Sequence, residues 1–218
     1  MIIAIDGPAG TGKTTVSKIL AKRLSISYLD TGATYRALTL KALDNDVDLS
    51  NKDVLIDLAK TLNLQIQGEN VYLEGVDVNF KIRTPVVDKN ISLIVSYSEV
   101  RQIMVELQRK LAKIGDYVVE GRDITTVVFP QAEFKFYLDG DTSVRAQRRY
   151  NELIVKGLDV NFEDVKKDLI RRDNADKNRS TGALKISEDA KIIDTTNLTV
   201  AETVDELIKN VKKDETGR

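Results

Sequence analysis

The chain has 218 residues, 42% of them hydrophobic, and a formal net charge of −1 at pH 7. This size and apolar share suit one three-layer domain with a buried core, and the near-neutral charge does not favour a broad surface for nucleic acid or an anionic membrane. The absence of Cys and His excludes disulfides, thiolate nucleophiles and most zinc sites. No run approaches the ~20 apolar residues of a membrane span, so we expect a soluble cytoplasmic protein.

A glycine-rich loop follows the first apolar run. Residues 2–5 predict a buried strand and residues 15–24 predict a helix. The loop between them fits the spacing G-x-x-x-x-G-K-[ST], in which backbone N–H groups cradle phosphates. In this motif a lysine, here Lys13, reaches the β- and γ-phosphates and a hydroxyl, here Thr14, binds Mg²⁺. The loop residues predicted to bind a nucleoside triphosphate are Gly7, Pro8, Ala9, Gly10, Thr11, Gly12, Lys13, Thr14 and Thr15.

A second strand and helix follow this helix. Residues 27–29 predict the strand, and a helix over 33–43 carries Tyr35 and Arg36 in its first turns. Ligands gather where the strands of an open α/β sheet end and helices begin, so these residues and Thr31 suit a phosphate and a flat base or sugar. Taken alone, the pattern favours a half-buried tyrosine and a solvated arginine.

An insert interrupts the α/β order. Residues 50–63 predict a helix capped by Ser50, after which residues 64–67 and 71–74 alternate as strands around a tight turn. We expect a small appended subdomain that ends where Pro85 starts the next helix. Residues 86–95 and 99–114 then predict two helices, which carry the otherwise unremarkable Ser92 and Arg101 at positions usually exposed to solvent.

The third strand, at 117–119, ends in a polar cluster. Glu120 closes the strand and is suited to hold Mg²⁺ or its water, and Arg122 beside Asp123 places a phosphate ligand next to a carboxylate. The alternative is a surface ion pair, usually worth about 1 kcal/mol or less. The position at a strand end favours a functional role.

The last third of the chain is rich in arginine. A strand at 134–139 precedes a helix capped by Thr142, which carries Arg145, Arg148 and Arg149 on one face. A second helix at 162–170 runs into another arginine cluster at 171–179. These clusters indicate either a solvated face or a lid that closes over phosphates and supplies positive charge. A strand at 191–194 and a helix at 200–211 follow.

These motifs, in this order, resemble the bacterial cytidylate kinases, which are P-loop nucleoside monophosphate kinases. The resemblance covers nearly the whole chain. The matching segments are 7–15, 30–36, 121–123, 127–130 and the residues Arg172, Asp173, Asp176 and Arg179. It implies a single α/β kinase domain over 1–218, with five parallel strands, a monophosphate-binding region at 31–114, a hairpin-containing insert near 64–84 and a mobile helical lid at 150–184.

The resemblance also implies roles for individual residues. The monophosphate is expected to contact Thr31, Tyr35, Arg36, Arg122 and Arg179. The cytosine is expected to contact Ser92, Arg101 and Asp123, and the sugar Arg172 and Asp176. Lys13, Arg122, Arg172 and Arg179 are the expected catalytic residues, and ATP is also expected to contact Arg148. The sequence departs from the common family pattern at Thr31, Glu120, Thr125 and Ala183, where Ser, Asp, Gly and Pro are frequent.

The leading functional hypothesis is therefore transfer of a phosphoryl group from ATP, with Mg²⁺, to CMP and also to dCMP. A kinase of the same architecture that acts on UMP, dTMP or a small metabolite is the nearest alternative. A nucleotide-dependent switch or RNA-associated module is a further one. A GTP-reading switch would carry Asn-Lys-x-Asp, and residues 51–54 fail this pattern at the fourth position. We expect a monomer with no nucleic-acid or membrane partner.

Overall fold

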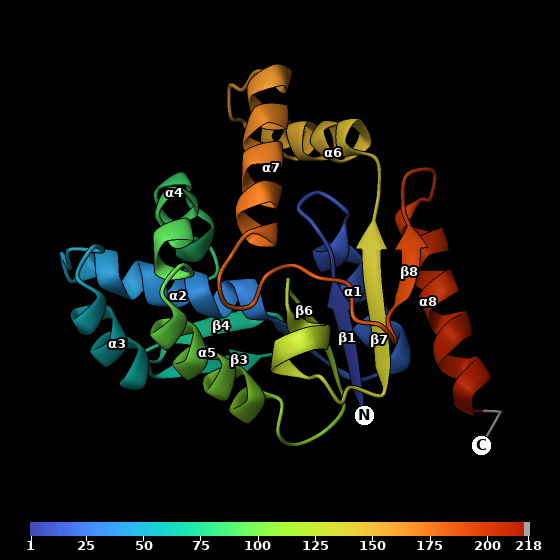
Figure 1. The fold of residues 1–218 in the computed structure, drawn as a ribbon, viewed down its shortest axis with the longest axis horizontal. Coiled ribbons are helices and arrows are strands. Elements are labelled where there is room, and N and C mark those ends of the chain that lie inside the picture. The colour runs from blue at the N-terminus through green and yellow to red at the C-terminus, as the bar shows by residue number, and fades with distance from the viewer. Residues whose placement is uncertain (216–218) are drawn as a thin grey trace.

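A five-stranded parallel sheet forms the centre of the computed structural model, which describes residues 1–215 (Figure 1). Its spatial order is β2-β6-β1-β7-β8. The strands are β1 (Ile2–Asp6), β2 (Ser27–Asp30), β6 (Tyr117–Glu120), β7 (Phe134–Asp139) and β8 (Lys191–Asp194). The register aligns Asp30 with Glu120 and Glu120 with Ile5, so β2 and β6 end at one level and β1 extends one residue further, to Asp6. The predicted α/β fold with five parallel strands is confirmed.

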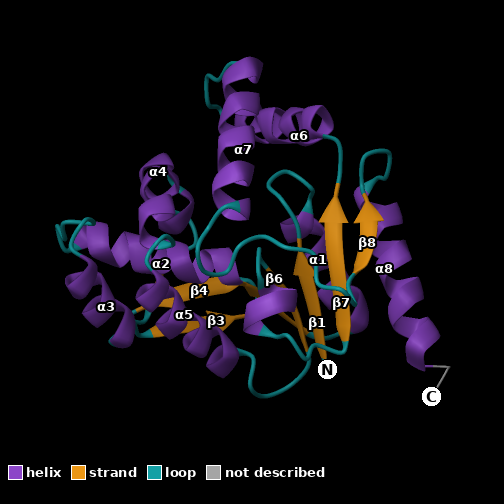
Figure 2. Cartoon of the chain, in the orientation of Figure 1, coloured by secondary structure: helices purple, strands orange, loops and turns teal. Residues whose placement is uncertain are grey.

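Helices cover both faces of this sheet and make the three layers (Figure 2). On one face, α1 (Lys13–Leu24) and α8 (Val200–Glu215) pack against side chains such as Ile3 and Ile5 of β1. On the other, α5 (Ser98–Leu111) and the single π-helical turn η2 (Ile124–Val128) pack against Ala4. Successive residues of β1 therefore face opposite layers, as the pleat of a strand requires.

The insert is a small antiparallel sheet that packs on helices beside the main sheet. It consists of β3 (Leu64–Gln67), β4 (Asn70–Leu73) and β5 (Val76–Asp77), followed by the 3₁₀ turn η1 (Lys81–Arg83). A separate apolar core joins it to α2 (Thr31–Asp44), α3 (Lys52–Lys60), α4 (Pro85–Ile94) and α5. The predicted insert is present, and it is one strand larger than a hairpin.

The predicted cap of α3 is wrong by one residue. Asn51, not Ser50, is the N-cap, and its side chain accepts a hydrogen bond from the backbone N–H of Val54. The Ser50 hydroxyl instead donates to Asp48. Both residue types favour caps, and the local turn with Asp48 decides between them.

Two helices project beyond the carboxyl ends of the strands (Figure 1). They are α6 (Thr142–Val155) and α7 (Phe162–Lys177). Asp141 rather than Thr142 caps α6, since its carboxylate accepts from the N–H groups of Ser143 and Val144. The helix α7 is longer than predicted and contains most of the second arginine cluster, residues 171–179. The helix therefore fixes the positions of those side chains. No helix within residues 1–215 is both long and apolar enough to cross a membrane.

Candidate active site

A cavity of about 850 Å³ opens at the carboxyl ends of the strands, where parallel α/β sheets bind ligands. Its walls come from the glycine-rich loop, the start of α2, helices α4 to α7, the end of β6 and the segment between β8 and α8. Every residue predicted to bind ATP or the acceptor lines this cavity except Gly7 and Pro8. Gly7 packs under the loop, where a Cβ would collide with the carbonyl oxygen of Leu138.

The glycine-rich loop leads directly into α1 and forms one end of the cavity. Gly12 is the N-cap with φ of 85°, a left-handed conformation that glycine adopts without strain. The buried Lys13 Nζ donates to the Pro8 carbonyl oxygen over 2.6 Å. Burial, and to a smaller extent the nearby Arg122, lowers the pKa of Lys13 to about 7. A phosphate at this position would supply the anion that the lysine lacks.

Four arginines gather at the middle of the cavity, on α2, α7 and the segments after β6 and α7. Asp176 compensates two of them, accepting from Arg122 Nε over 2.8 Å and pairing closely with Arg179 Nη2. Arg36 Nε donates to Asp88 over 3.2 Å.

Arg172 is the exception among these arginines. Within residues 1–215 it forms no ion pair or hydrogen bond, and burial, Arg122 and Arg36 lower its pKa to about 10. An uncompensated guanidinium among others is an anion site.

A buried ion pair between α5 and the segment after β6 lines the cavity. Arg101 Nη2 pairs closely with Asp123 Oδ2, and both residues are at most 5% exposed. The guanidinium of Arg101 also lies over the Tyr35 ring, 5.4 Å from its centroid. Gly182 closes over this pair, because a Cβ at that position would collide with both charged groups. Ser92 lines the cavity from the exposed surface of α4.

The structure places Tyr35 nearer this charged pair than the sequence pattern suggests. Its side chain is 6% exposed, and its buried hydroxyl lies beside the side chain of Gln108. Burial raises the pKa of Tyr35 to about 12, so the hydroxyl stays protonated. Arg101 Nε is also buried and without a partner in this part of the chain. This unsatisfied guanidinium nitrogen indicates that a ligand or water completes the cavity beside Arg101.

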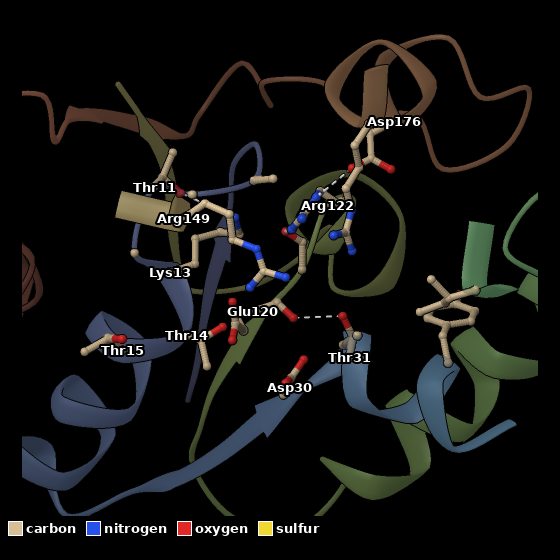
Figure 3. Close-up of a pocket in the computed structure, with 18 of the residues that line it drawn as sticks. Thr11, Lys13, Thr14, Thr15, Asp30, Thr31, Glu120, Arg122, Arg149 and Asp176 are labelled. Carbon is tan, nitrogen blue, oxygen red and sulfur yellow. Dashed lines mark hydrogen bonds and ion pairs between the residues drawn. The ribbon is translucent and has the colours of Figure 1, made fainter. Parts of the chain in front are cut away.

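Oxygen ligands for a hard cation lie beside the lysine. Figure 3 shows Thr14, Glu120 and Asp30 facing the same space. Tyr28 Oη donates to Glu120 Oε1 over 2.7 Å, and Thr31 Oγ1 donates to the Glu120 carbonyl oxygen over 2.8 Å. Burial, reinforced by Asp30, raises the pKa of Glu120. One or two carboxylates, a hydroxyl and substrate phosphates are the donor set that Mg²⁺ takes, so these residues fit that ion.

The three arginines of α6 do not share one role. Arg145 is buried and binds Asp173 Oδ2 over 2.6 Å and the Ala9 carbonyl oxygen over 2.8 Å. Asp173 also accepts from the N–H of Ala9, so it attaches α7 to the loop. Arg148 instead binds the segment after β8.

Arg148 Nη1 donates to the Thr195 hydroxyl over 3.0 Å, and its other terminal nitrogen donates to carbonyl oxygens of the same segment. Arg149 pairs with Glu152 and reaches toward the cavity (Figure 3). The spacing places the three arginines on one face of α6 as predicted, but their partners differ: the loop and Asp173 for Arg145, the segment after β8 for Arg148, and Glu152 for Arg149.

The model of the cytidylate kinase family matches residues 3–213. The chain belongs to the cytidylate kinase family. Two curated relatives carry the name cytidylate kinase and match almost end to end. That of Caldanaerobacter subterraneus subsp. tengcongensis is 45% identical over 215 residues, which cover 99% of this chain and 96% of the relative. That of Alkaliphilus oremlandii is 46% identical over 210 residues, covering 96% and 97%. The resemblance inferred from the motifs is confirmed.

Solved structures share the fold at much lower identity. An uncharacterized protein from Eubacterium ventriosum has a TM-score of 0.52 at 16% identity, covering 97% of this chain and 98% of its own. A shikimate kinase from Bacteroides thetaiotaomicron has a TM-score of 0.51 at 10% identity, with the same coverage. These likenesses support the α/β architecture alone.

Two departures from the common cytidylate kinase pattern have a structural account. Thr31 keeps the hydroxyl that a serine would supply, and that hydroxyl binds the end of β6. Thr125 adds a hydroxyl that donates to the buried Asp6 over 2.7 Å. Asp6 itself was not among the predicted site residues. The sequence does show a carboxylate at the end of a buried strand, which could have marked Asp6 as a candidate. Its partner Thr125, however, lies more than a hundred residues away in sequence.

Proposed function

We propose that this chain transfers the γ-phosphoryl group of ATP to CMP, and also to dCMP, to give ADP and the nucleoside diphosphate. The observation that carries the acceptor assignment is the buried Arg101–Asp123 pair, which lines the same cavity as Lys13. A carboxylate accepts from the cytosine amino group, and a guanidinium donates to the ring acceptors. A kinase of the same architecture acting on UMP, dTMP or a small metabolite is the alternative.

The proposed mechanism is direct in-line transfer without a phosphorylated protein intermediate. The attacking oxygen belongs to a phosphate that is already anionic at neutral pH, so no general base is required. The chain has no His or Cys to form a phosphohistidine or phosphocysteine. Rate enhancement then comes from alignment of the two phosphates and from neutralisation of the charge between them.

Each cationic side chain has a place in this scheme. Lys13 would bind the phosphates of ATP, and Arg172 and Arg179 would reach the transferring group from the lid side. Arg36 and Arg122 would hold the acceptor phosphate with the Thr31 hydroxyl.

We expect Mg²⁺ to bind in the same cavity as these lysine and arginine side chains. Mg²⁺ bound by Thr14 and Glu120 would supply further charge neutralisation at the phosphates. In this scheme Thr11, Thr15 and Arg148 would complete the ATP site.

A coupled assay with ATP, Mg²⁺ and a panel of acceptors tests this proposal. We expect ADP formation with CMP and dCMP and slow turnover with UMP, dTMP and small alcohols. Turnover that is as fast with another acceptor would reassign the substrate. Exchange of label between ATP and ADP in the absence of any acceptor would contradict direct transfer, because it requires a phosphorylated protein.

We also propose that residues 150–184 move as a lid when substrates bind. Arg172 lacks a partner in the described chain, and its repulsion from Arg122 and Arg36 is relieved once phosphates arrive. Gly157 and Gly182 have positive φ of 76° and 64°; Gly157 lies between α6 and α7, and Gly182 lies near the end of the segment, which supports Gly182 as the hinge.

Limited proteolysis is the measurement for the lid. An analogue that joins adenosine and cytidine through phosphates should slow cleavage within 150–184 several-fold and leave cleavage elsewhere unchanged, since a closed lid excludes the protease. Equal cleavage of this segment with and without the analogue would contradict a lid.

The same proposal covers the organisation of the chain. We regard it as one kinase domain, with a monophosphate-binding region at 31–114 and an insert near 64–84. Residues 216–218 of that domain lie outside the described part. We further propose a cytoplasmic monomer that binds small nucleotides, and the near-neutral charge does not favour nucleic acid or membranes as partners.

A further inference from the structure

The carboxylate of Asp6 joins two segments that the sequence keeps far apart. Asp6 is the last residue of β1, directly before the glycine-rich loop, and it is completely buried. Its Oδ1 accepts from the backbone N–H of Ile124 over 2.9 Å. Its Oδ2 accepts from the backbone N–H of Thr125 over 2.8 Å and from the Thr125 hydroxyl over 2.7 Å. All three donors belong to the same turn.

That turn directly follows Arg122 and Asp123. The backbone ladder between β1 and β6 ends with the N–H of Gly121 donating to the Ile5 carbonyl oxygen over 3.0 Å. Beyond this point the side chain of Asp6 replaces the ladder and holds the next residues of the chain. The positions of the phosphate-binding and base-reading side chains, relative to the glycine-rich loop, therefore depend on this carboxylate.

Burying the carboxylate of Asp6 costs free energy of folding, which indicates that the position of the turn it binds is important. No lysine or arginine in residues 1–215 forms an ion pair with Asp6. Burial raises the pKa of Asp6 to about 6 even though the hydrogen bonds from Thr125 and Ile124 act to lower it. A buried carboxylate without a cation is tolerated only when well-placed donors satisfy it, and an apolar residue would avoid the cost but could not bind the turn.

We infer that Asp6 is a positioning residue that sets the separation of the two bound phosphates, and that the hydroxyl of Thr125 completes its hold on the acceptor turn. The inference rests on the proposed function, because it concerns the alignment of ATP with an acceptor. Loosening this link displaces Arg122 and Asp123 while the glycine-rich loop keeps its own contacts. Acceptor binding and alignment then suffer more than ATP binding.

Substitutions at Thr125 test the inference with little change in shape. Thr125→Val removes the hydroxyl, and Thr125→Ser keeps it. We expect Thr125→Val to raise the KM for CMP roughly 3–10-fold, the loss typical of removing a single hydrogen bond. The KM for ATP should change less than about 2-fold, and Thr125→Ser should restore the KM for CMP to near the parent value. If the two variants have the same KM for CMP, the inference is wrong.

A neighbouring residue provides the matched control. Thr126 has a buried hydroxyl without a hydrogen-bond partner in the described chain, so Thr126→Val removes the same group from the same turn without breaking a contact. Its KM for CMP should equal that of the parent. A rise equal to that of Thr125→Val would show that the turn tolerates no substitution, and it would overturn a specific role for the bond to Asp6.

Asp6→Asn provides the larger effect and a second readout. The amide places an N–H group against the N–H donors of the turn, so we expect kcat/KM for CMP to fall ~10²-fold. Misaligned phosphates should also increase the ATP hydrolysed per CDP formed, and a residue that only stabilises the fold would not change this ratio once the protein is folded. An unchanged ratio in a variant that melts as a folded protein counts against positioning.

These measurements separate the inference from the proposed function. If the acceptor panel identifies a different acceptor, the same variants are assayed with that acceptor, and the comparison of Thr125→Val with Thr125→Ser keeps its meaning. If no acceptor is turned over, the proposed function fails and the inference fails with it. If CMP is turned over but Thr125→Val and Thr126→Val behave alike, only the inference fails.

Discussion

Replacing Lys13 with alanine should lower kcat by about three orders of magnitude or more and leave the fold intact. The expected size is that of removing a preorganised cation from a site where charge develops, which typically costs 10²–10³-fold for a single donor and more for a charged group. Among residues 1–215, Lys13 Nζ donates hydrogen bonds only to neutral oxygens, Pro8 O and Thr11 Oγ1. Its removal breaks no ion pair, and the protein should melt close to the parent temperature.

The measurement is steady-state kinetics with ATP and CMP alongside thermal melting. Lys18→Ala is the matched control, because Lys18 lies on the same helix but pairs with Glu69 on the exposed surface of the insert. That variant should keep near-parent kcat. A Lys13→Ala enzyme with kcat within about tenfold of the parent would contradict both the phosphate role of the lysine and the proposed site.

The second large effect concerns the choice between CMP and UMP. Cytosine presents an amino donor at N4 and acceptors at N3 and O2, whereas uracil presents an acceptor at O4 and a donor at N3. With uracil in the site, the Asp123 carboxylate would face an acceptor and the Arg101 guanidinium would face a donor. A buried polar group left unpaired costs about 1–3 kcal/mol, and more when charged, so we expect kcat/KM to favour CMP by ~10² or more.

Arg101→Met should narrow this preference mainly by impairing CMP. The substitution also leaves Asp123 buried without its partner, and breaking a buried pair in this way destabilises proteins by about 3–5 kcal/mol. The ratio of kcat/KM for CMP to that for UMP, measured below the melting transition, is therefore the informative quantity. If the ratio remains at the parent value, Arg101 does not read the base.

Asp123→Asn examines the same pair with less risk to the fold. The amide keeps the size of the side chain and can donate to the O4 of uracil, so UMP should improve relative to CMP. Comparable kcat/KM values for CMP and UMP in the unmodified protein would remove the basis of both variants and leave only a general monophosphate kinase.

The parts that sequence reasoning predicted well are those with local signals. Lys13 and Thr14 occur within a strand, loop and helix whose spacing is specific, and the alternation over 64–74 identified the insert. Helix ends were less accurate, as at Asn51, because several capping residues compete within a few positions. The extent of α7 was underestimated because charged residues carry no apolar periodicity.

Long-range contacts were beyond the reach of local patterns. Nothing in the neighbourhood of Asp6 indicates that it binds Thr125, and nothing near Arg145 indicates that it binds Asp173 rather than a ligand. Both partners become visible only when the fold brings distant segments together. Arg101 came from the family resemblance alone, since its position on a helix looks ordinary in isolation. Asp123 was indicated by its place after a strand end, and the resemblance supplied its role beside the base.

The backbone of Gly182 over the Arg101–Asp123 pair has a consequence for the speed of substrate entry. Because a Cβ there would already collide with both charged groups, a nucleobase enters between Gly182 and the pair only after that segment lifts. If the acceptor takes this route rather than reaching the pair through the open cavity, its association rate is limited by how often the segment opens and not by diffusion. The backbone around Gly182 also keeps bulk water from the Arg101–Asp123 pair between turnovers. When the segment opens and an acceptor binds, the nucleobase replaces Gly182 as the group packed on the pair.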